Sequence, residues 1–133
     1  MHVGEAGFIF YCDDVKRARD FYAAVLQKVP RLDVDGMVEF QLTPHAVLGL
    51  MPTAGIRRLL GDAIVDPASS DAPQAELYVV VDDVEAAHRR ALDAGGRELS
   101  AVQPRNWGDT AGYVADLDGH VLALASRASV SSM

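Results

Sequence analysis

The sequence repeats one short pattern in its two halves, and this repeat constrains the fold more than any other feature. Residues 8 to 18 read FIFYCDDVKRA, and residues 77 to 87 read LYVVVDDVEAA. In both copies an apolar run ends at a pair of aspartates, after which apolar residues recur at helical spacing. We therefore expect two similar halves, each beginning with a strand that leads into a helix.

The first helix is predicted to begin after Asp13 or Asp14, because an aspartate side chain can accept from the free amides of a first helical turn. Pro30 is expected to close it. Its buried stripe is predicted to comprise Val15, Ala18, Phe21, Tyr22, Val25 and Val29.

The second helix is predicted to begin after Asp82 or Asp83, and Asp82 with Glu85 resembles a capping box. Gly95-Gly96 supplies the left-handed stop that commonly ends a helix. Its buried stripe is predicted to comprise Val84, Ala87, His88, Ala91 and Leu92.

Three strands are predicted after each helix from apolar alternation and turn residues. In the first half, Asp35-Gly36 lies inside RLDVDGMVEFQL as a strong hairpin signal, and HAVLGLM follows a turn at Thr43-Pro44. In the second half the strands are RELSAV, TAGYVAD and HVLALAS, separated by the loop QPRNWGD and the turn LDG. Each half thus reads strand, helix, strand, strand, strand, which predicts an α+β fold.

The chain of 133 residues is expected to form a single domain, residues 1–133. Within it we place a first βαβββ module over 6–51, a linker over 52–75, a second βαβββ module over 76–126 and a flexible tail over 127–133. The linker is rich in Pro, Ser, Asp and Ala, with at most one helical turn at IRRLLGD. Two such modules suggest pseudo-symmetry, with curved mixed sheets around a cup-shaped cavity.

Composition and charge exclude several classes of function. The apolar share of 50% and the charged share of 23% are ordinary for a soluble globular protein, and no apolar run is long enough to span a bilayer. A net charge of −7 would repel nucleic acid and an anionic membrane surface, so we expect neither as a partner. Cys12 is the single cysteine, and the start MHVGEAGFIFY lacks signal-peptide features, so we expect a cytoplasmic protein.

Four motifs, taken in order, resemble the vicinal oxygen chelate superfamily, which includes glyoxalase I, bleomycin-resistance proteins and extradiol dioxygenases. They are the first aspartate pair followed by RDFYAAVL, the unit VDDVEAAHRRALDAGG, the loop NWGD and the segment YVADLDGHVLAL. The last resembles the family's Asp-Pro-Asp-Gly turn, with Leu117 in place of proline. The resemblance covers residues 6 to 126 and implies the glyoxalase/bleomycin resistance fold, which hosts many functions.

The resemblance also implies where a metal would be held. Metal enzymes of this superfamily take His, Glu or Gln ligands from the first and last strands of each half. The matching positions here are Gly7, Gly49, Glu76 and Ala123. Because glycine and alanine side chains cannot coordinate, and a catalytic site needs about three protein ligands, we expect no metal and no cofactor there.

Alternation along the strands predicts which side chains face the cup. Phe8, Phe10 and Cys12 are expected to pack against the helices. The side chains that we expect to bind a ligand are Tyr11, Glu39, Gln41, Met51, Tyr78 and Trp107. The structural alternatives are that the tyrosines only pack in the core and that the tryptophan only anchors its loop.

Glu76 is the one candidate catalytic residue. If buried and unpaired, its carboxyl would have a raised pKa and could act as a general base. The alternative is a solvated residue at the start of a strand.

A mainly apolar cup with a few polar groups favours an organic ligand, and aromatic faces near carboxylates suit a flat or cationic one. We therefore predict a metal-free protein that binds a small organic molecule, an antibiotic or a metabolite, as bleomycin-resistance proteins do. One alternative is a glyoxalase-like lyase or isomerase, or a dioxygenase-related enzyme, with a displaced metal site or with Glu76 as base. Another is a partner-binding module with no small ligand.

The resemblance further implies a homodimer, because in this superfamily the cups are commonly completed between two chains. An exposed strand edge on either half would permit that pairing.

Overall fold

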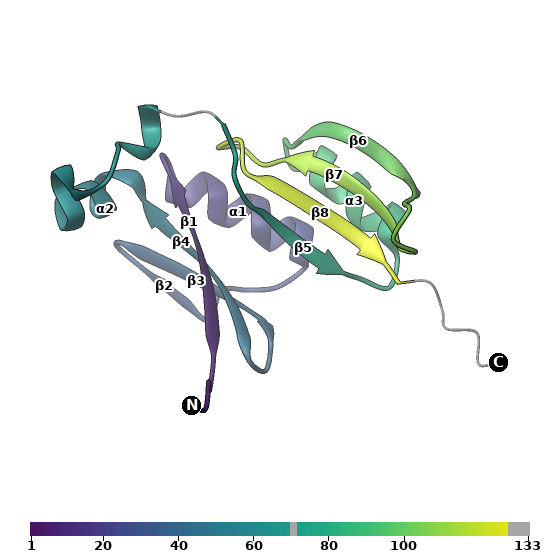
Figure 1. Cartoon of the computed structure of the whole chain (residues 1–133), viewed down its shortest axis with the longest axis horizontal. Coiled ribbons are helices and arrows are strands. Elements are labelled where there is room, and N and C mark those ends of the chain that lie inside the picture. Colours follow the sequence, from purple (N-terminus) through teal and green to yellow (C-terminus); the bar gives the residue numbers. More distant parts are fainter. Residues whose placement is uncertain (70–71, 128–133) are drawn as a thin grey trace. The chain divides into compact units, whose positions relative to one another are not determined.

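A computed structural model describes residues 1–69 and 72–127 (Figure 1). The chain divides into two compact units: residues 1–23 with 27–72, and residues 24–26 with the chain from Pro73 onward. Each unit contains a four-stranded mixed sheet, and the described residues include three α-helices, so the predicted α+β class is confirmed. Of the tail predicted to be flexible, residues 128–133 lie outside the described residues.

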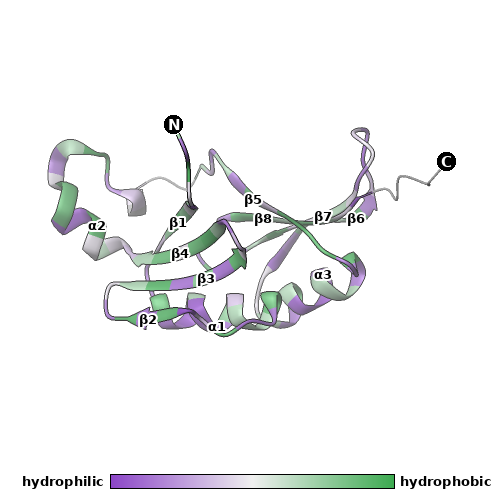
Figure 2. Cartoon of the chain, turned by 90° about the horizontal axis from the view of Figure 1, so that it is seen from below, coloured by the Kyte–Doolittle hydropathy of each residue, from purple (hydrophilic) through white to green (hydrophobic). Residues whose placement is uncertain are grey.

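The first unit follows the predicted order of strand, helix and three strands. Its sheet has the order β1-β4-β3-β2, with β1 parallel to β4 and the other pairs antiparallel. The central strand β4 is hydrophobic along most of its length (Figure 2). The elements are β1 (Ala6–Cys12), α1 (Val15–Leu26), β2 (Leu32–Val34), β3 (Met37–Thr43) and β4 (Ala46–Pro52).

The hairpin between β2 and β3 forms at the predicted dipeptide. Val34 pairs with Met37, which leaves Asp35 and Gly36 as a two-residue turn. Gly36 has a φ of 94°, a backbone conformation that is open to glycine and strained for other residues.

Helix α1 begins where the sequence predicted and ends earlier. Of the two candidate caps, Asp14 is the one used, since its side chain accepts from the Arg17 backbone N–H at 3.1 Å. The helix stops at Leu26 because Gln27 adopts a left-handed conformation with a φ of 54°. The expectation that Val29 belongs to the buried stripe is therefore wrong: it lies beyond the helix and is 85% exposed.

The core of the first unit lies between α1 and one face of its sheet. Phe21 and Tyr22 are buried there with edge-on rings 4.9 Å apart, together with fully buried residues of β4. Cys12 is also fully buried, as expected. Phe8 is not: this side chain is 51% exposed, on a strand flanked by only one neighbour in the described residues.

The segment that we expected to be a linker is more helical than its composition suggested. It forms α2 (Thr53–Leu60), followed by two short 3₁₀ turns at Gly61–Ala63 and Pro67–Ser69. Ile56 is only 5% exposed and fixes the helix to the unit, whereas Leu59 is 70% exposed. Apolar burial on one face is what makes a two-turn helix stable here.

The second unit repeats the topology of the first. Its sheet has the order β5-β8-β7-β6, with β5 parallel to β8, so the duplication read from the aspartate pairs extends to strand order. The elements are β5 (Glu76–Val80), α3 (Val84–Asp93), β6 (Arg97–Pro104), β7 (Thr110–Ala115) and β8 (Val121–Ser126).

Helix α3 is capped by the second aspartate of its pair. Asp83 accepts from the Ala86 backbone N–H at 3.1 Å, so the capping box suggested for Asp82 and Glu85 is not formed. Gly95, with a φ of 108°, follows the helix as predicted. No helix in the described part of the chain is long and apolar enough to cross a bilayer.

Candidate functional site

Strand register shows which side chains share the sheet face that points away from the buried core in the first unit. Gly49 pairs with both Ile9 and Glu39, so these three residues form one row across β1, β4 and β3. Tyr11 pairs with Met51 in a neighbouring row. Two of the predicted ligand-binding residues, Tyr11 and Met51, are therefore adjacent and half-buried.

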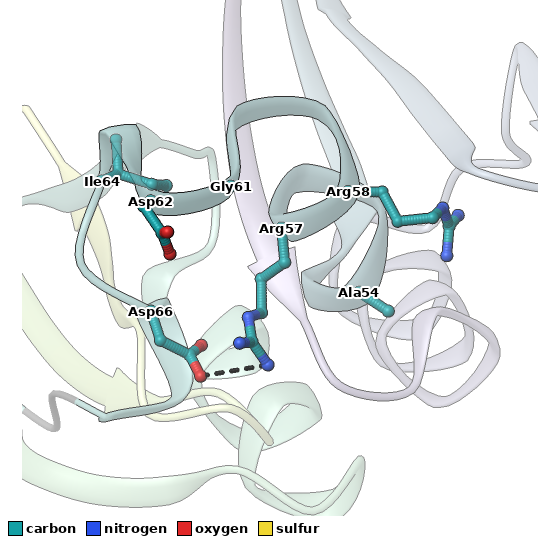
Figure 3. A pocket seen from close by; sticks show the side chains of 7 residues that line it. All are labelled: Ala54, Arg57, Arg58, Gly61, Asp62, Ile64 and Asp66. Atoms are coloured by element: carbon teal, nitrogen blue, oxygen red, sulfur yellow. Dashed lines mark ion pairs between the residues drawn. The ribbon is translucent and has the colours of Figure 1, made fainter.

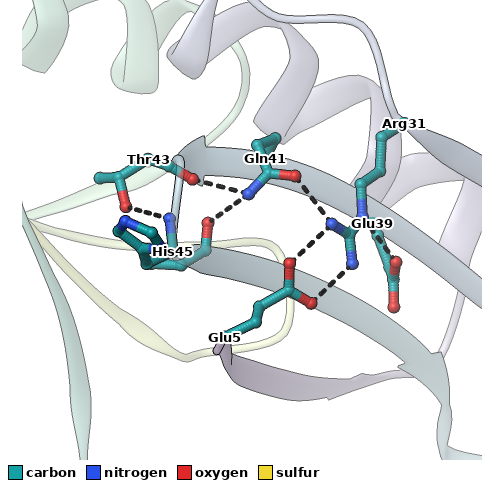
Figure 4. A network of polar contacts seen from close by, with 7 residues as sticks. Glu5, Arg31, Glu39, Gln41, Thr43 and His45 are labelled. Atoms are coloured by element: carbon teal, nitrogen blue, oxygen red, sulfur yellow. Dashed lines mark hydrogen bonds and ion pairs between the residues drawn. The ribbon is translucent and has the colours of Figure 1, made fainter. Parts of the chain in front are cut away.

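Arg31 is the centre of a polar network on this first sheet (Figure 4). Its Nε donates to Glu39 at 2.9 Å and its Nη1 donates to Gln41 at 2.7 Å. Its Nη1 and Nη2 also donate to the two carboxylate oxygens of Glu5, at 2.9 and 3.0 Å. These hydrogen bonds lower the pKa of the Glu5 carboxyl and raise that of Arg31. Glu39 and Gln41, both predicted from the sequence, are thus joined through an arginine that sequence reasoning missed.

The second unit brings Tyr78 and Trp107 together. The Tyr78 hydroxyl donates to Asp109 Oδ2 at 2.7 Å and accepts from Trp107 Nε1 at 3.0 Å. Asp109 is buried, and its carboxylate lies 3.8 Å from Arg127. Burial and the hydrogen bond to Asp109 raise the pKa of Tyr78 above its ordinary value. Asp109 was not among the predicted site residues, although it lies in the quoted loop NWGD.

The loop that carries Trp107 is closed by its own backbone. The Arg105 N–H donates to the Asp109 carbonyl at 2.8 Å, and the Gly108 N–H donates to the Arg105 carbonyl at 3.1 Å. The Arg105 guanidinium also donates to the Ala111 carbonyl at 2.8 Å and lies 5.1 Å from the centre of the Tyr113 ring. The indole is therefore held in place at its N–H and by its loop, yet remains 54% exposed.

The positions at which the superfamily holds a metal do not fit one here. A Cβ on Gly49 would lie 2.5 Å from Ile9 Cδ1 and 3.3 Å from Met37 Sδ, so the ends of two apolar side chains now lie where a ligand side chain would begin. Ala123 is fully buried. Neither position supplies a coordinating atom, and Ala123 pairs in register with Tyr78 and Tyr113, whose rings are not metal ligands of this superfamily.

The remaining two positions offer little more. Gly7 has no side chain, and Glu76 is exposed as the first residue of β5, where it pairs with Val121. The burial that the general-base hypothesis requires is therefore not found at Glu76.

Three possible metal ligands elsewhere belong to one turn, in which they are hydrogen-bonded to one another. Asp116, Asp118 and His120 have ligand atoms within 4.8 Å of one another. However, Asp116 accepts from the backbone N–H groups of Asp118 and His120 at 2.9 and 2.8 Å, and its second oxygen lies 2.8 Å from His120 Nδ1. The carboxylate is thus used to shape the turn before β8.

Two open hollows in the first unit contain none of the predicted site residues. One, of about 390 Å³, lies beside α2, where Arg57 pairs with Asp66 at 3.3 Å (Figure 3). The other, of about 520 Å³, lies at the start of α1 and is lined by four aspartates. One of these aspartates caps α1 and another pairs with Arg19, so part of this charge is already used in the fold.

Residues 7–125 match the family model described as a glyoxalase-like domain. The chain belongs to the glyoxalase-like domain family. That family lies in the vicinal oxygen chelate superfamily, so the resemblance drawn from the four motifs is confirmed.

Relatives of this glyoxalase-like chain include uncharacterized mycobacterial proteins. One from Mycobacterium bovis is 32% identical over 113 residues, which cover 81% of this chain and 73% of the relative. One from Mycobacterium tuberculosis is 32% identical over 113 residues, and there the match spans 65% of the relative's length. The chain thus corresponds to about two thirds of the M. tuberculosis protein.

Solved structures from other organisms share the fold. A glyoxalase-related enzyme from Fulvimarina pelagi superposes with a TM-score of 0.78 at 23% identity, over 92% of this chain and 86% of that one. A glyoxalase/bleomycin resistance protein/dioxygenase family enzyme from Burkholderia phytofirmans superposes with a TM-score of 0.76 at 14% identity, over 95% and 98%. At these identities the likeness establishes the glyoxalase-like fold alone.

Proposed function

We propose that this glyoxalase-like chain binds a small organic molecule without a metal ion, with Trp107 and Tyr78 as the principal contacts. The observation that carries the proposal is the held but uncovered indole. Trp107 donates to the Tyr78 hydroxyl at 3.0 Å and is still 54% exposed. A large aromatic surface that is fixed before binding loses little entropy on contact, which favours a planar ligand.

The family's metal positions support a binding role that does not depend on coordination. Gly49 is covered by Ile9 and Met37, and Ala123 pairs in register with Tyr78 on one side and Tyr113 on the other. Methyl and aromatic groups therefore replace the expected carboxylate in the second sheet. We propose a flat ligand that stacks on the indole, and an aromatic face also suits a ligand with cationic character.

The single tryptophan makes the proposal directly measurable. Chelator-treated protein would be titrated with bleomycin and with a panel of planar cationic antibiotics and aromatic metabolites while indole fluorescence is followed. We expect saturable quenching by at least one compound, with an affinity that is unchanged when divalent metal is restored. Tyr78→Phe keeps the reporter but removes the hydroxyl that holds it, so affinity should fall about tenfold.

Two results would contradict this function. The first is saturable binding that appears only after a transition metal is added, together with stoichiometric metal in elemental analysis. The second is a panel in which neither fluorescence nor melting temperature responds to any compound. Leu59→Ala, which removes another exposed apolar side chain, is the matched control and should leave affinity unchanged.

The enzyme alternative is tested in the same protein. A lyase or isomerase that uses Glu76 as base would catalyse proton exchange on a carbonyl substrate, and Glu76→Ala would abolish it. Because Glu76 is exposed, we expect no such exchange in metal-free protein. We therefore propose a binding role for this chain and not a catalytic one. We also propose that it acts in the cytoplasm.

A further inference from the structure

The Arg31 guanidinium on the first sheet is bound by a carboxylate from the chain's own N-terminal segment. We propose that this guanidinium is a binding site for the carboxylate of a small organic acid, and that Glu5 occupies the site as an internal competitor. The proposal concerns the first unit alone and does not depend on Trp107.

The guanidinium is positioned by β3 before any ligand arrives. Glu39 accepts from its Nε at 2.9 Å and Gln41 accepts from its Nη1 at 2.7 Å. Gln41 is itself fixed, since its amide donates to the Thr43 carbonyl at 2.6 Å. The Arg31 backbone N–H also donates to the Glu39 carbonyl at 2.8 Å. An arginine held in this way presents a rigid fork to an incoming anion.

Glu5 takes that fork in the manner of a ligand. Its two oxygens accept from Nη1 and Nη2 at 2.9 and 3.0 Å, which is the paired geometry by which arginine recognises carboxylates. Glu5 precedes β1 in an exposed stretch, and its side chain is 43% exposed, whereas that of Glu39 is 22% exposed within a strand. Glu5 is therefore the partner that can leave without disturbing the sheet.

The surroundings of the guanidinium indicate what the rest of the ligand would be. Glu39 pairs with Gly49, and Gly49 pairs with Ile9, which is 41% exposed and leans over the glycine. Met51 and Tyr11 form the adjacent row. A carboxylate on Arg31 would thus place the remainder of the molecule along an apolar strip. The class is a monocarboxylate with a compact apolar body.

An internal carboxylate competes at an effective concentration in the millimolar range. The affinity that a free acid shows is its intrinsic affinity multiplied by the fraction of molecules in which Glu5 has left the guanidinium. Removing the charge of Glu5 should therefore tighten the binding of a free carboxylate. The net charge of −7 should keep anions from binding elsewhere on the chain.

Benzoate is the probe, and benzamide is its neutral counterpart. Binding would be followed in every variant by NMR saturation transfer from the protein to the probe. In the variants that retain Arg31, its Nε–H signal would be followed as well, assigned by its loss in Arg31→Lys. We expect weak saturable binding to the wild type, binding roughly five- to tenfold tighter to Glu5→Gln, and none to Arg31→Lys. Benzamide should bind to none of them. Arg58→Lys controls for non-specific anion binding at another arginine and should behave as the wild type.

Equal benzoate affinity in Glu5→Gln and the wild type would overturn the proposal, as would binding to neither. Either result would mean that the Glu5–Arg31 contact only ties down the N-terminal segment. Circular dichroism of Glu5→Gln checks that the variant is folded. Repeating the titration in Trp107→Phe separates the two proposals, because the Arg31 response should persist when the indole site is removed.

Discussion

At the scale of single residues, the Tyr78 hydroxyl is held by one hydrogen bond that it donates and one that it accepts. It donates to Asp109 and accepts from Trp107, so both of its roles are filled only while the phenol is neutral. Ionisation would place a phenolate beside a buried carboxylate. The geometry thus stabilises one protonation state as well as one orientation of the indole.

We predict that Tyr78 ionises above its ordinary pKa of 10.0, first because of burial and second because of its hydrogen bond to Asp109. A raised folded-state pKa means that the stabilisation is fully present below pH 10 and is lost as pH rises through the folded value. Absorbance of tyrosinate, compared between the wild type and Tyr78→Phe, isolates this titration from the other three tyrosines.

Asp109→Asn removes the charged acceptor that raises the pKa of Tyr78 and leaves the burial of the hydroxyl unchanged. The Tyr78 midpoint should therefore move down toward 10.0 without falling below it. A midpoint at or below 10.0 in the wild type would contradict the assigned environment.

Sequence reasoning found some residues of these clusters and missed others for a physical reason. Tyr78 and Trp107 stood out because strand alternation and a loop motif are local patterns. Asp109 is bonded to Tyr78 and Arg31 is bonded to Glu5, and in both pairs the two residues are far apart in sequence. A contact of that kind depends on how strands are paired, which a single sequence does not record.

At the scale of elements, the two aspartates of each pair have different roles. In each pair only the second residue, Asp14 or Asp83, is seen to cap the helix with its side chain. We predict that Asp83→Ala lowers the free energy of unfolding by about 1 kcal/mol, because an amide of the first turn loses its acceptor. Urea unfolding measures this change.

The neighbouring aspartate is the matched control. Asp82→Ala removes the same charge from the same exposed end of α3 and should change stability by less than about 0.5 kcal/mol. Equal losses in the two variants would show that charge near the helix end, and not the hydrogen bond, is responsible.

Elements fixed by short-range chemistry could be read from the sequence, and those fixed by packing could not. The Asp35-Gly36 turn and the Gly95 stop were predicted because each needs glycine at a positive φ. The end of α1 was misplaced because a left-handed Gln27 has no strong sequence signal. Helix α2 was underestimated because Ile56 forms its anchor through tertiary contact.

At the scale of the whole molecule, the edge strand of the first sheet is the feature that bears on assembly. In the described residues β1 is hydrogen-bonded to β4 alone, and it exposes Phe8 and Ile9 to 51% and 41%. Such an edge favours association with another strand. A homodimer remains our prediction for this chain.

Sedimentation at micromolar concentration should give twice the 14.3 kDa mass of one chain. Phe8→Glu should shift the mass toward a single chain, because it places a charge on the exposed edge. Val29→Glu alters a residue that is 85% exposed and lies away from any strand, so its mass should match the wild type. A single-chain mass for the wild type would refute the dimer.

The contact of Ile9 with Gly49 also limits how a chain like this can change over generations. A side chain that could coordinate at position 49 would meet Ile9 Cδ1 at once, since even its Cβ would lie 2.5 Å away. A larger residue there would require the Ile9 side chain to turn away from the backbone of position 49, and a coordinating group would find no further ligand at Gly7 or Ala123. One substitution at position 49 would therefore not create a metal centre, because two of the other three positions would still lack a coordinating side chain.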